Sequence, residues 1–181
     1  MTDPASGPFL FDTSAESYFG RLQSEVEAGW LANYTFPMYV AVPSVVERAR
    51  GYYIAIASAA PARRAEIQHK MLQYIHTLKA GPRVLNLTVP IALLAAQLMS
   101  LSPRPPSPPP HSHQATESRQ DRLSRWRFDI MIAATALVHN LPLIHNNPQD
   151  FESLRALIER LPERFPGVGP LNLISVKRLA A

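Results

Sequence analysis

Three acidic side chains stand where a metal-dependent hydrolase would place them. Asp12 follows a short apolar run, Glu47 lies soon after a second one, and Asp129 opens an alanine-rich apolar stretch. Carboxylates that are packed together repel one another, and a divalent cation removes that penalty because ions such as Mg²⁺ take oxygen ligands. One or two such ions can activate water and stabilise the charge on a phosphodiester during its cleavage. These acids therefore point to nuclease or phosphatase chemistry.

Two more oxygen-bearing side chains, Asn147 and Asp150, follow directly after a fourth apolar run. Either could complete a cation site through water. Taken singly, an acid at the end of a strand or in the first turn of a helix is most often a turn or capping residue that offsets the helix dipole. Spacing alone leaves both interpretations open for each residue.

Alternating strands and helices must position these side chains. Short apolar runs predict the strands, and longer stretches between them predict helices, with Ser14 as a possible N-cap of the first one. This order is typical of a parallel sheet covered on both faces, so we expect an α/β protein with a three-layer α/β/α sandwich. Such sheets bind ligands beyond the carboxyl ends of their strands. The expected strands span residues 9–11, 38–42, 83–87, 141–144 and 171–176, and the expected helices span residues 14 onward, 44–59, 61–77, 90–99, 128–139 and 149–161.

A proline-rich stretch interrupts this alternation. Six of the 18 prolines lie between Ser100 and His111, and each one fixes φ and lacks a backbone N–H. We expect a loop at about residues 101–124, inserted into a single domain that spans residues 1–181, because neither flank looks complete alone. His111 and His113 lie in this stretch without partner ligands, so we do not expect them to bind metal.

The composition fits a globular protein, with 46% hydrophobic and 18% charged residues. The chain has no cysteine, which excludes disulfides and thiolate metal sites and fits a reducing cytoplasm. The N-terminus has no basic start and no apolar core, so no signal peptide is expected, and the longest apolar run is too short to span a membrane. The net charge of +4 and a pI of about 9.7 weakly favour a polyanionic partner.

Three blocks of the sequence resemble a known family. The segment 129–151, DIMIAATALVHNLPLIHNNPQDF, closely resembles the C-terminal signature of PIN domains, in which an Asp opens an Ala-rich helix and a "T-x-N-x-x-D-F" stretch follows the next strand. FLFDTS at 9–14 looks like the family's opening strand with its "D-T-S", and VPSVVERARG at 42–51 resembles its "L-A-E-L-x-x-G" segment. The blocks occur in the family's order and cover most of the chain outside the insertion.

The resemblance implies a PIN-like fold and a metal-dependent endoribonuclease. It implies that Asp12, Glu47 and Asp129 bind Mg²⁺ or Mn²⁺, with Asn147 as a further ligand or Asp150 as a further catalytic acid. It most often also implies the toxin of a type II toxin–antitoxin pair, similar to VapC, which has an RNA substrate, a cognate antitoxin and a homodimeric form.

The sequence departs from the family pattern at several points. Asn147 stands where the family often has a further acid, and His145 replaces a small hydroxyl residue. Ala15 and Glu16 replace an apolar pair, and the proline-rich insertion replaces a short connection. These departures keep a second hypothesis open, a PIN-like protein that binds nucleic acid or a partner without cutting. A phosphatase of the haloacid dehalogenase type is excluded, because it needs an acid at the place of Ser14.

Other residues carry weaker predictions. Ser14 and Thr13 could support Asp12 by hydrogen bonding, and His145 is expected to be structural. The tyrosine-bearing segment 52–56, YYIAI, is more apolar than a small core needs, which suggests self-association or an antitoxin contact there, with core packing as the alternative. A basic run could follow a phosphate backbone or form a solvated helix face. Its members are Arg119, Arg122, Arg125 and Arg127.

Overall fold

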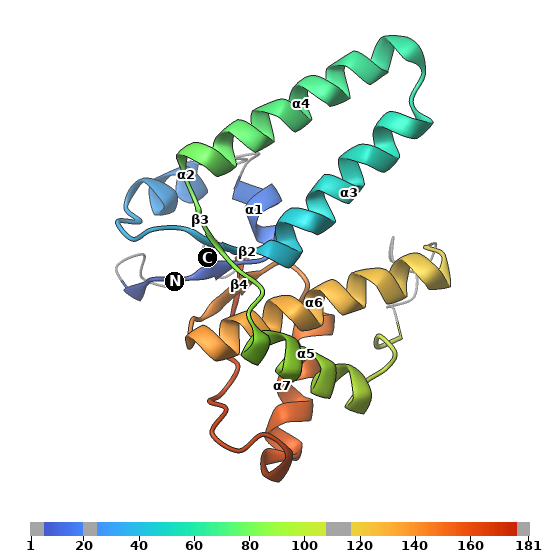
Figure 1. Ribbon diagram of the computed structural model, residues 1–181. Coiled ribbons are helices and arrows are strands. Elements are labelled where there is room, and N and C mark those ends of the chain that lie inside the picture. The colour runs from blue at the N-terminus through green and yellow to red at the C-terminus, as the bar shows by residue number, and fades with distance from the viewer. Residues whose placement is uncertain (1–5, 20–24, 108–116, 177–181) are drawn as a thin grey trace.

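Five strands form one parallel sheet in the part of the chain that the computed structural model describes, residues 6–19, 25–107 and 117–176 (Figure 1). The strand order is β3-β2-β1-β4-β5, so β1 is central. The chain adds β2 and β3 on one side of β1 and then crosses back to add β4 and β5 on the other. The strands are β1 (Leu10–Phe11), β2 (Tyr39–Ala41), β3 (Arg83–Leu85), β4 (Leu143–His145) and β5 (Leu173–Ser175).

Helices cover both faces of the sheet. Leu10 and Leu143 belong to the larger core on one face, and Phe11 and Ile144 belong to the second core on the other. Successive strand residues face opposite sides, so strands buried on both faces appear in the sequence as continuous apolar runs. The predicted three-layer α/β/α sandwich is confirmed. The larger core holds α5 (Val89–Leu101), α6 (Arg119–His139) and α7 (Pro148–Arg160), and the second core holds α1 (Thr13–Phe19) and α2 (Glu25–Ala32).

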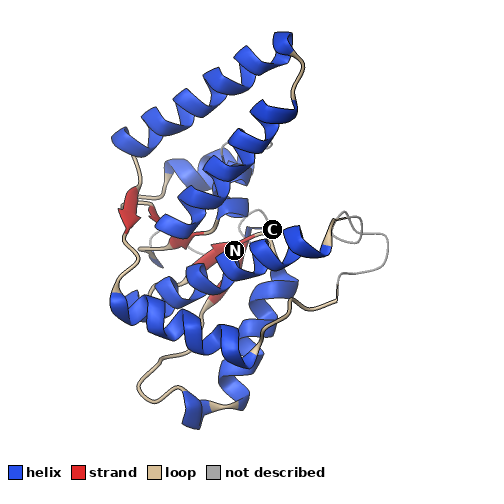
Figure 2. Ribbon diagram, turned by 45° about the vertical axis from the view of Figure 1, so that its right-hand side comes forward, coloured by secondary structure: helices blue, strands red, loops and turns tan. Residues whose placement is uncertain are grey.

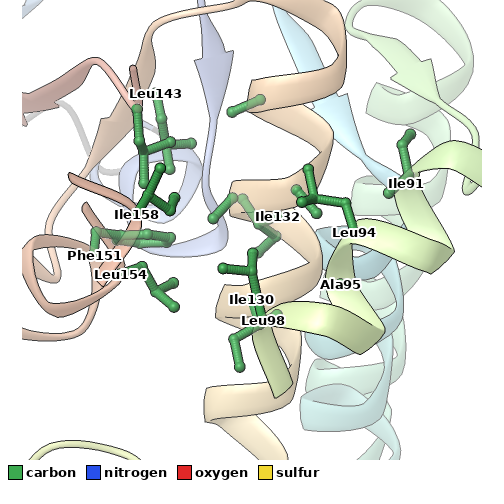
Figure 3. Close-up of a cluster of buried hydrophobic side chains, with 14 of the residues drawn as sticks. Ile91, Leu94, Ala95, Leu98, Ile130, Ile132, Leu143, Phe151, Leu154 and Ile158 are labelled. Carbon is green, nitrogen blue, oxygen red and sulfur yellow. The ribbon is translucent and has the colours of Figure 1, made fainter. Parts of the chain in front are cut away.

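Helix α6 runs through the middle of the larger core (Figure 3). Its Ile130 and Ile132 are fully buried, between Leu98 of α5 and Phe151 of α7. The helix ends at Asn140, which adopts the left-handed conformation (φ 51°, ψ 44°) expected of a C-terminal cap. This packing fixes the position of every other residue on α6, including Asp129.

A long helical hairpin projects away from the sheet (Figures 1 and 2). It consists of α3 (Val42–Ser58) and α4 (Pro61–Ala80), and both helices carry a proline at the first or second position, where its missing N–H costs nothing. Most residues on the outer part of the hairpin are exposed. Its base, near β2, is the part that contributes to the site described below.

Several predicted boundaries were wrong. The strand expected at residues 38–42 does not reach Val42, and the helix expected from residue 44 already begins there. The helix that was expected from residue 128 begins at Arg119, inside the range predicted as loop, so α6 is about two and a half turns longer than expected. Helix α2 was not predicted. Residues 103–107 are irregular, as expected for the proline-rich stretch, and His111 and His113 lie outside the described residues. No helix in the described residues is long and apolar enough to cross a membrane.

Candidate active site

Asp12 lies at the point where the order in which strands are added to the sheet reverses. Neighbouring strands β2 and β4 flank β1, and the chain leaves β1 toward one and returns later to the other. The Asp12 backbone N–H donates to the Ile144 carbonyl at 3.0 Å, which holds the residue between β1 and β4. In open parallel sheets ligands bind at this kind of crevice, beyond the carboxyl ends of the strands.

The Asp12 side chain also caps helix α1. Its Oδ1 accepts a hydrogen bond from the Ala15 backbone N–H at 2.5 Å, and its carboxylate accepts the Ser14 hydroxyl at 2.9 and 2.7 Å. Asp12 is therefore the N-cap, and the prediction that Ser14 takes this position was wrong. The predicted hydrogen-bond support of Asp12 by Ser14 is confirmed. Ser14 Oγ also accepts from the Asn146 backbone N–H at 3.0 Å, so it links α1 to the loop after β4.

A small cavity brings most of the predicted site residues together. It has a volume of about 160 Å³ and lies over the carboxyl edge of the sheet. Asp150, the remaining predicted acid, does not line the cavity but is buried beside it. The lining residues are Asp12, Thr13, Ser14, Ser17, Glu47, Arg125, Asp129 and Asn147.

Glu47 and Asp129 reach this cavity from helix interiors. Glu47 was expected in the first turn of its helix, but α3 begins at Val42 and places it in the second turn. Asp129 was expected at the start of its helix and instead lies midway along α6, where it is only 4% exposed. Neither acid caps a helix. The alternative considered from the sequence, that each is only a turn or capping residue, therefore does not apply.

Asn147 joins the two buried acids. Its Nδ2 donates to Asp129 Oδ2 at 3.2 Å and to Asp150 Oδ2 at 2.7 Å. One amide thus offsets two carboxylates that would otherwise meet without a donor between them. This arrangement explains how Asp150 influences the cavity although it does not line it.

The acids of the cavity are strongly coupled. Burial raises the pKa of Asp12 to about 7, against hydrogen bonds from Ser14 and Ala15 that lower it, and the Glu47 charge raises it further. Burial also raises the pKa of Asp129 well above its usual value, and the charges of Asp150, Glu47 and Asp12 add to this rise. Burial raises the pKa of Glu47 as well. Concentrated buried carboxylates of this kind are costly without a cation.

Arg125 was not selected as a site residue from the sequence, yet it lines the cavity. Its Nη1 pairs with Glu117 Oε1 at 2.5 Å, and its buried Nε has no hydrogen-bond partner among the described residues. The positive charge lowers the pKa of both Glu47 and Asp129. The sequence signal was its place four residues before Asp129, on the same face of a helix.

The carboxyl groups do not form a closed metal cage. Among residues 6–19, 25–107 and 117–176, no three His, Asp or Glu side chains are grouped closely enough to hold one ion together. Mg²⁺ seldom needs such a cage, because it usually keeps several waters and binds one or two carboxylates. A cavity bounded by Asp12, Glu47 and Asp129, with acids that raise one another's pKa, fits that kind of ion.

His145 is buried behind the site rather than in it. It is 1% exposed, its ring centroid lies 5.2 Å from that of Phe151, and it does not line the cavity. Burial lowers its pKa to about 4, so the imidazole is neutral near pH 7. A packing role agrees with the expectation for this residue.

The bridging amide leads to a prediction for Asn147→Asp. The change replaces a shared donor by a third carboxylate, so the metal-free protein should lose about 1–3 kcal/mol of unfolding free energy. Mn²⁺ should recover that loss, because it binds only the folded state. Urea unfolding in EDTA and in Mn²⁺ measures both effects. Asn146→Asp, at an exposed neighbouring position, is the matched control, and an equal loss in the two variants would contradict the bridge.

Solved structures share this arrangement of strands and helices. The DNA-bound VapBC from Salmonella typhimurium is 18% identical over 92% of this chain and 96% of that chain, with a TM-score of 0.53. VapBC2 from Rickettsia felis bound to a promoter DNA fragment is 12% identical over 92% and 97%, with a TM-score of 0.54. FitAcB from Neisseria gonorrhoeae is 21% identical over 81% and 93%, with a TM-score of 0.51.

By sequence, no protein-family model and no curated protein matches the chain. At these identities the likeness is one of fold, and it extends over nearly the whole length of each solved chain. The chain therefore has the PIN-like α/β fold of VapBC and FitAcB, with its acidic cavity at the carboxyl edge of the sheet.

Proposed function

We propose that this protein is a metal-dependent endoribonuclease that serves as the toxin of a toxin–antitoxin pair. The observation that carries the proposal is the cavity in which Asp12, Glu47 and Asp129 meet from three separate segments. The resemblance of its three sequence blocks to VapC-like PIN domains and the fold shared with VapBC support the same function.

The residues of the cavity suit the hydrolysis of a phosphodiester. Asp12, Glu47 and Asp129 would hold hydrated Mg²⁺ or Mn²⁺, with the Asn147 carbonyl or Asp150 completing the site through water. A divalent ion bound there supplies water activation and neutralises developing phosphate charge. Ser14 and the α1 backbone fix the Asp12 carboxylate, so its orientation is set before substrate arrives.

Arg125 would bind the phosphate itself. Arg125 lines a cavity in which every other charged side chain is acidic, and a guanidinium donates well to phosphate oxygens. The Glu117 pair fixes the far end of the side chain. Arg125 is therefore held in place to offset the charge of a polyanion that approaches the carboxylates.

Purified protein and RNA test this function. We expect cleavage of single-stranded RNA with Mn²⁺ and none with EDTA. The second hypothesis, a PIN-like protein that binds without cutting, draws on Asn147, which brings no charge where the family often has an acid. RNA binding without cleavage at any Mn²⁺ concentration would favour this second function.

A larger cavity at the base of the α3–α4 hairpin offers a place for the antitoxin. It measures about 440 Å³ and is lined mostly by apolar atoms, from residues that include Phe19, Val40 and Tyr52. Arg48 lies at its wall, 3.4 Å from Glu16 and 4.5 Å from the Tyr74 ring centroid. An apolar pocket bordered by two cations, Arg48 and Lys70, and one anion, Glu16, fits an amphipathic segment of a partner protein.

Two neighbouring tyrosines distinguish a contact with the antitoxin from a contact with a second copy of this chain. Tyr52 lines the cavity, whereas Tyr53 is 63% exposed beside Ile54 at 51%, so the segment 52–56 does not pack into the core of a single chain. Tyr52→Ala should weaken copurification of the proposed antitoxin. Tyr53→Glu should weaken a homodimer roughly tenfold or more, since a charge would be buried in the contact. Sedimentation velocity measures the second effect, and a wild-type monomer at all concentrations would exclude the dimer.

A further inference from the structure

The proline-rich segment 102–107 is fixed to the helix that carries Asp129. Trp126 Nε1 donates to the Ser102 carbonyl at 2.8 Å, and Arg122 Nη2 donates to the Pro106 carbonyl at 2.8 Å. Gln149 of α7 donates to the Ser107 carbonyl. Side chains of α6 and α7 thus donate to backbone carbonyls of the segment. These hydrogen bonds keep the segment against the first turns of α6 (Figure 1).

The segment and α6 enclose a third cavity, the basic cavity. It measures about 440 Å³, and its lining includes Pro103, Arg104, Pro105, Arg119 and Arg122. The prolines restrict φ in this wall, and no acidic side chain lines the cavity. Three guanidinium groups therefore border one space without a negative charge among them.

These arginines lack ion-pair partners in the described residues, although acids lie close by. Asp121 pairs with Arg50 at 3.1 Å and accepts the Ser118 hydroxyl, while Glu117 pairs with Arg125. The neighbouring acids of α6 are thus engaged by other arginines. No carboxylate in residues 6–19, 25–107 or 117–176 forms a salt bridge with Arg104, Arg119 or Arg122.

The basic cavity and the acidic cavity are lined by the same helix, α6. Arg122, which borders the basic cavity, and Asp129, which borders the acidic one, are seven residues apart on α6. Seven residues make about two turns, so the two side chains share a face and their backbones are about 10 Å apart. Arg125, between them, lines the acidic cavity. Positive charge therefore continues from the acidic site along α6 for about two helical turns.

We propose that Arg104, Arg119 and Arg122, with the wall formed by the proline-rich segment, bind the phosphate backbone of single-stranded RNA beside the acidic site. This inference rests on the proposed nuclease function and names how that site holds its substrate. Phosphate contacts from arginines position a strand and carry no sequence preference. The site therefore sets where the strand lies relative to Asp129 and not which bases it contains.

The salt dependence of RNA binding tests this site. The probe is a fluorescein-labelled single-stranded RNA, measured by anisotropy with the full chain carrying Asp129→Asn, so that the RNA stays intact. In this background Arg104→Gln with Arg119→Gln should weaken binding roughly tenfold at low salt. It should also reduce the slope of log K against log salt by about 1.4, because each phosphate contact on a single strand contributes about 0.7.

The matched control is Arg63→Gln with Arg160→Gln. It removes the same charge from two exposed arginines on α4 and α7 that line neither cavity, and its slope should stay near that of the parent. Equal slopes in the two double variants would overturn the proposal. An acidic peptide that binds as tightly as the RNA and loses as much affinity would overturn it too, in favour of a protein ligand.

This test separates the subsite from the nuclease function. If the wild type cuts RNA and the Arg104 and Arg119 variant keeps the full slope, the subsite is wrong and the nuclease stands. If the slope falls as expected and the wild type cuts nothing in Mn²⁺, the subsite stands and the nuclease is wrong.

Discussion

Asp129→Asn should reduce Mn²⁺-dependent RNA cleavage by roughly 100-fold or more while the protein stays folded. Changes to residues that only support metal ligands typically cost 10–100-fold, so the loss of a ligand should reach at least the upper end. Asn has nearly the volume of Asp and removes a charge that burial and the Asp150 charge disfavour. The packing of α6 around the position is therefore kept.

Asp121→Asn is the matched control for this experiment. It makes the same chemical change on the same helix, at an exposed carboxylate that pairs with Arg50 outside the cavity. We expect its cleavage rate to remain near that of the wild type. Cleavage time courses across a Mn²⁺ titration measure both variants, and circular dichroism confirms that each one folds. Equal rates for Asp129→Asn and Asp121→Asn would remove Asp129 from the mechanism.

The second large effect concerns stability without metal. Asp12 is 2% exposed and its pKa rises from 3.8 to about 7 on folding, so the folded state holds this proton more tightly than the unfolded one. The stabilisation is complete below pH 3.8 and is lost as pH rises toward 7. At 1.36 kcal/mol for each pKa unit, the loss from Asp12 between pH 5 and pH 8 is about 3 kcal/mol.

Comparison with Asp12→Asn isolates this effect. The variant cannot titrate, so the free energy of unfolding of the wild type should fall relative to it by about 3 kcal/mol from pH 5 to pH 8 in EDTA. His145 acts in the opposite direction, because its pKa is lowered to about 4 and its contribution is lost as pH falls. That contribution is common to both proteins and cancels. Urea unfolding at the two pH values measures the difference, and a constant difference would show that Asp12 ionises freely.

Much of the fold could be predicted because the sheet is buried on both faces. Such strands are continuous apolar runs, and each predicted run overlaps a strand of the structure that is shorter by one or more residues. The meeting of Asp12, Glu47 and Asn147 followed from the same topology, since parallel strands end at one edge. The exact helix limits did not follow, because Pro43 fits both a strand end and a helix start.

The start of α6 was missed although the sequence contains its signal. Ser118 and Asp121 form an S-x-x-D pair, and the Ser118 side chain accepts from the Asp121 backbone N–H at 3.1 Å. The stretch that follows is mostly polar, with Trp126 as its one buried residue before Asp129, so its periodicity was weak. Tertiary contacts with segment 102–107 decide the structure here, and a single sequence does not display them.

Crystals soaked in Mn²⁺ test the proposed metal site, because manganese has an anomalous signal that carboxylates and water lack. We expect an anomalous peak inside the cavity lined by Asp12, Glu47 and Asp129, within direct or water-mediated reach of their oxygens. Crystals of Asp129→Asn soaked in the same way should show that peak weakened or lost. A fully soaked wild-type crystal with no peak in this cavity would contradict the proposed metal site, as would a peak only at another surface.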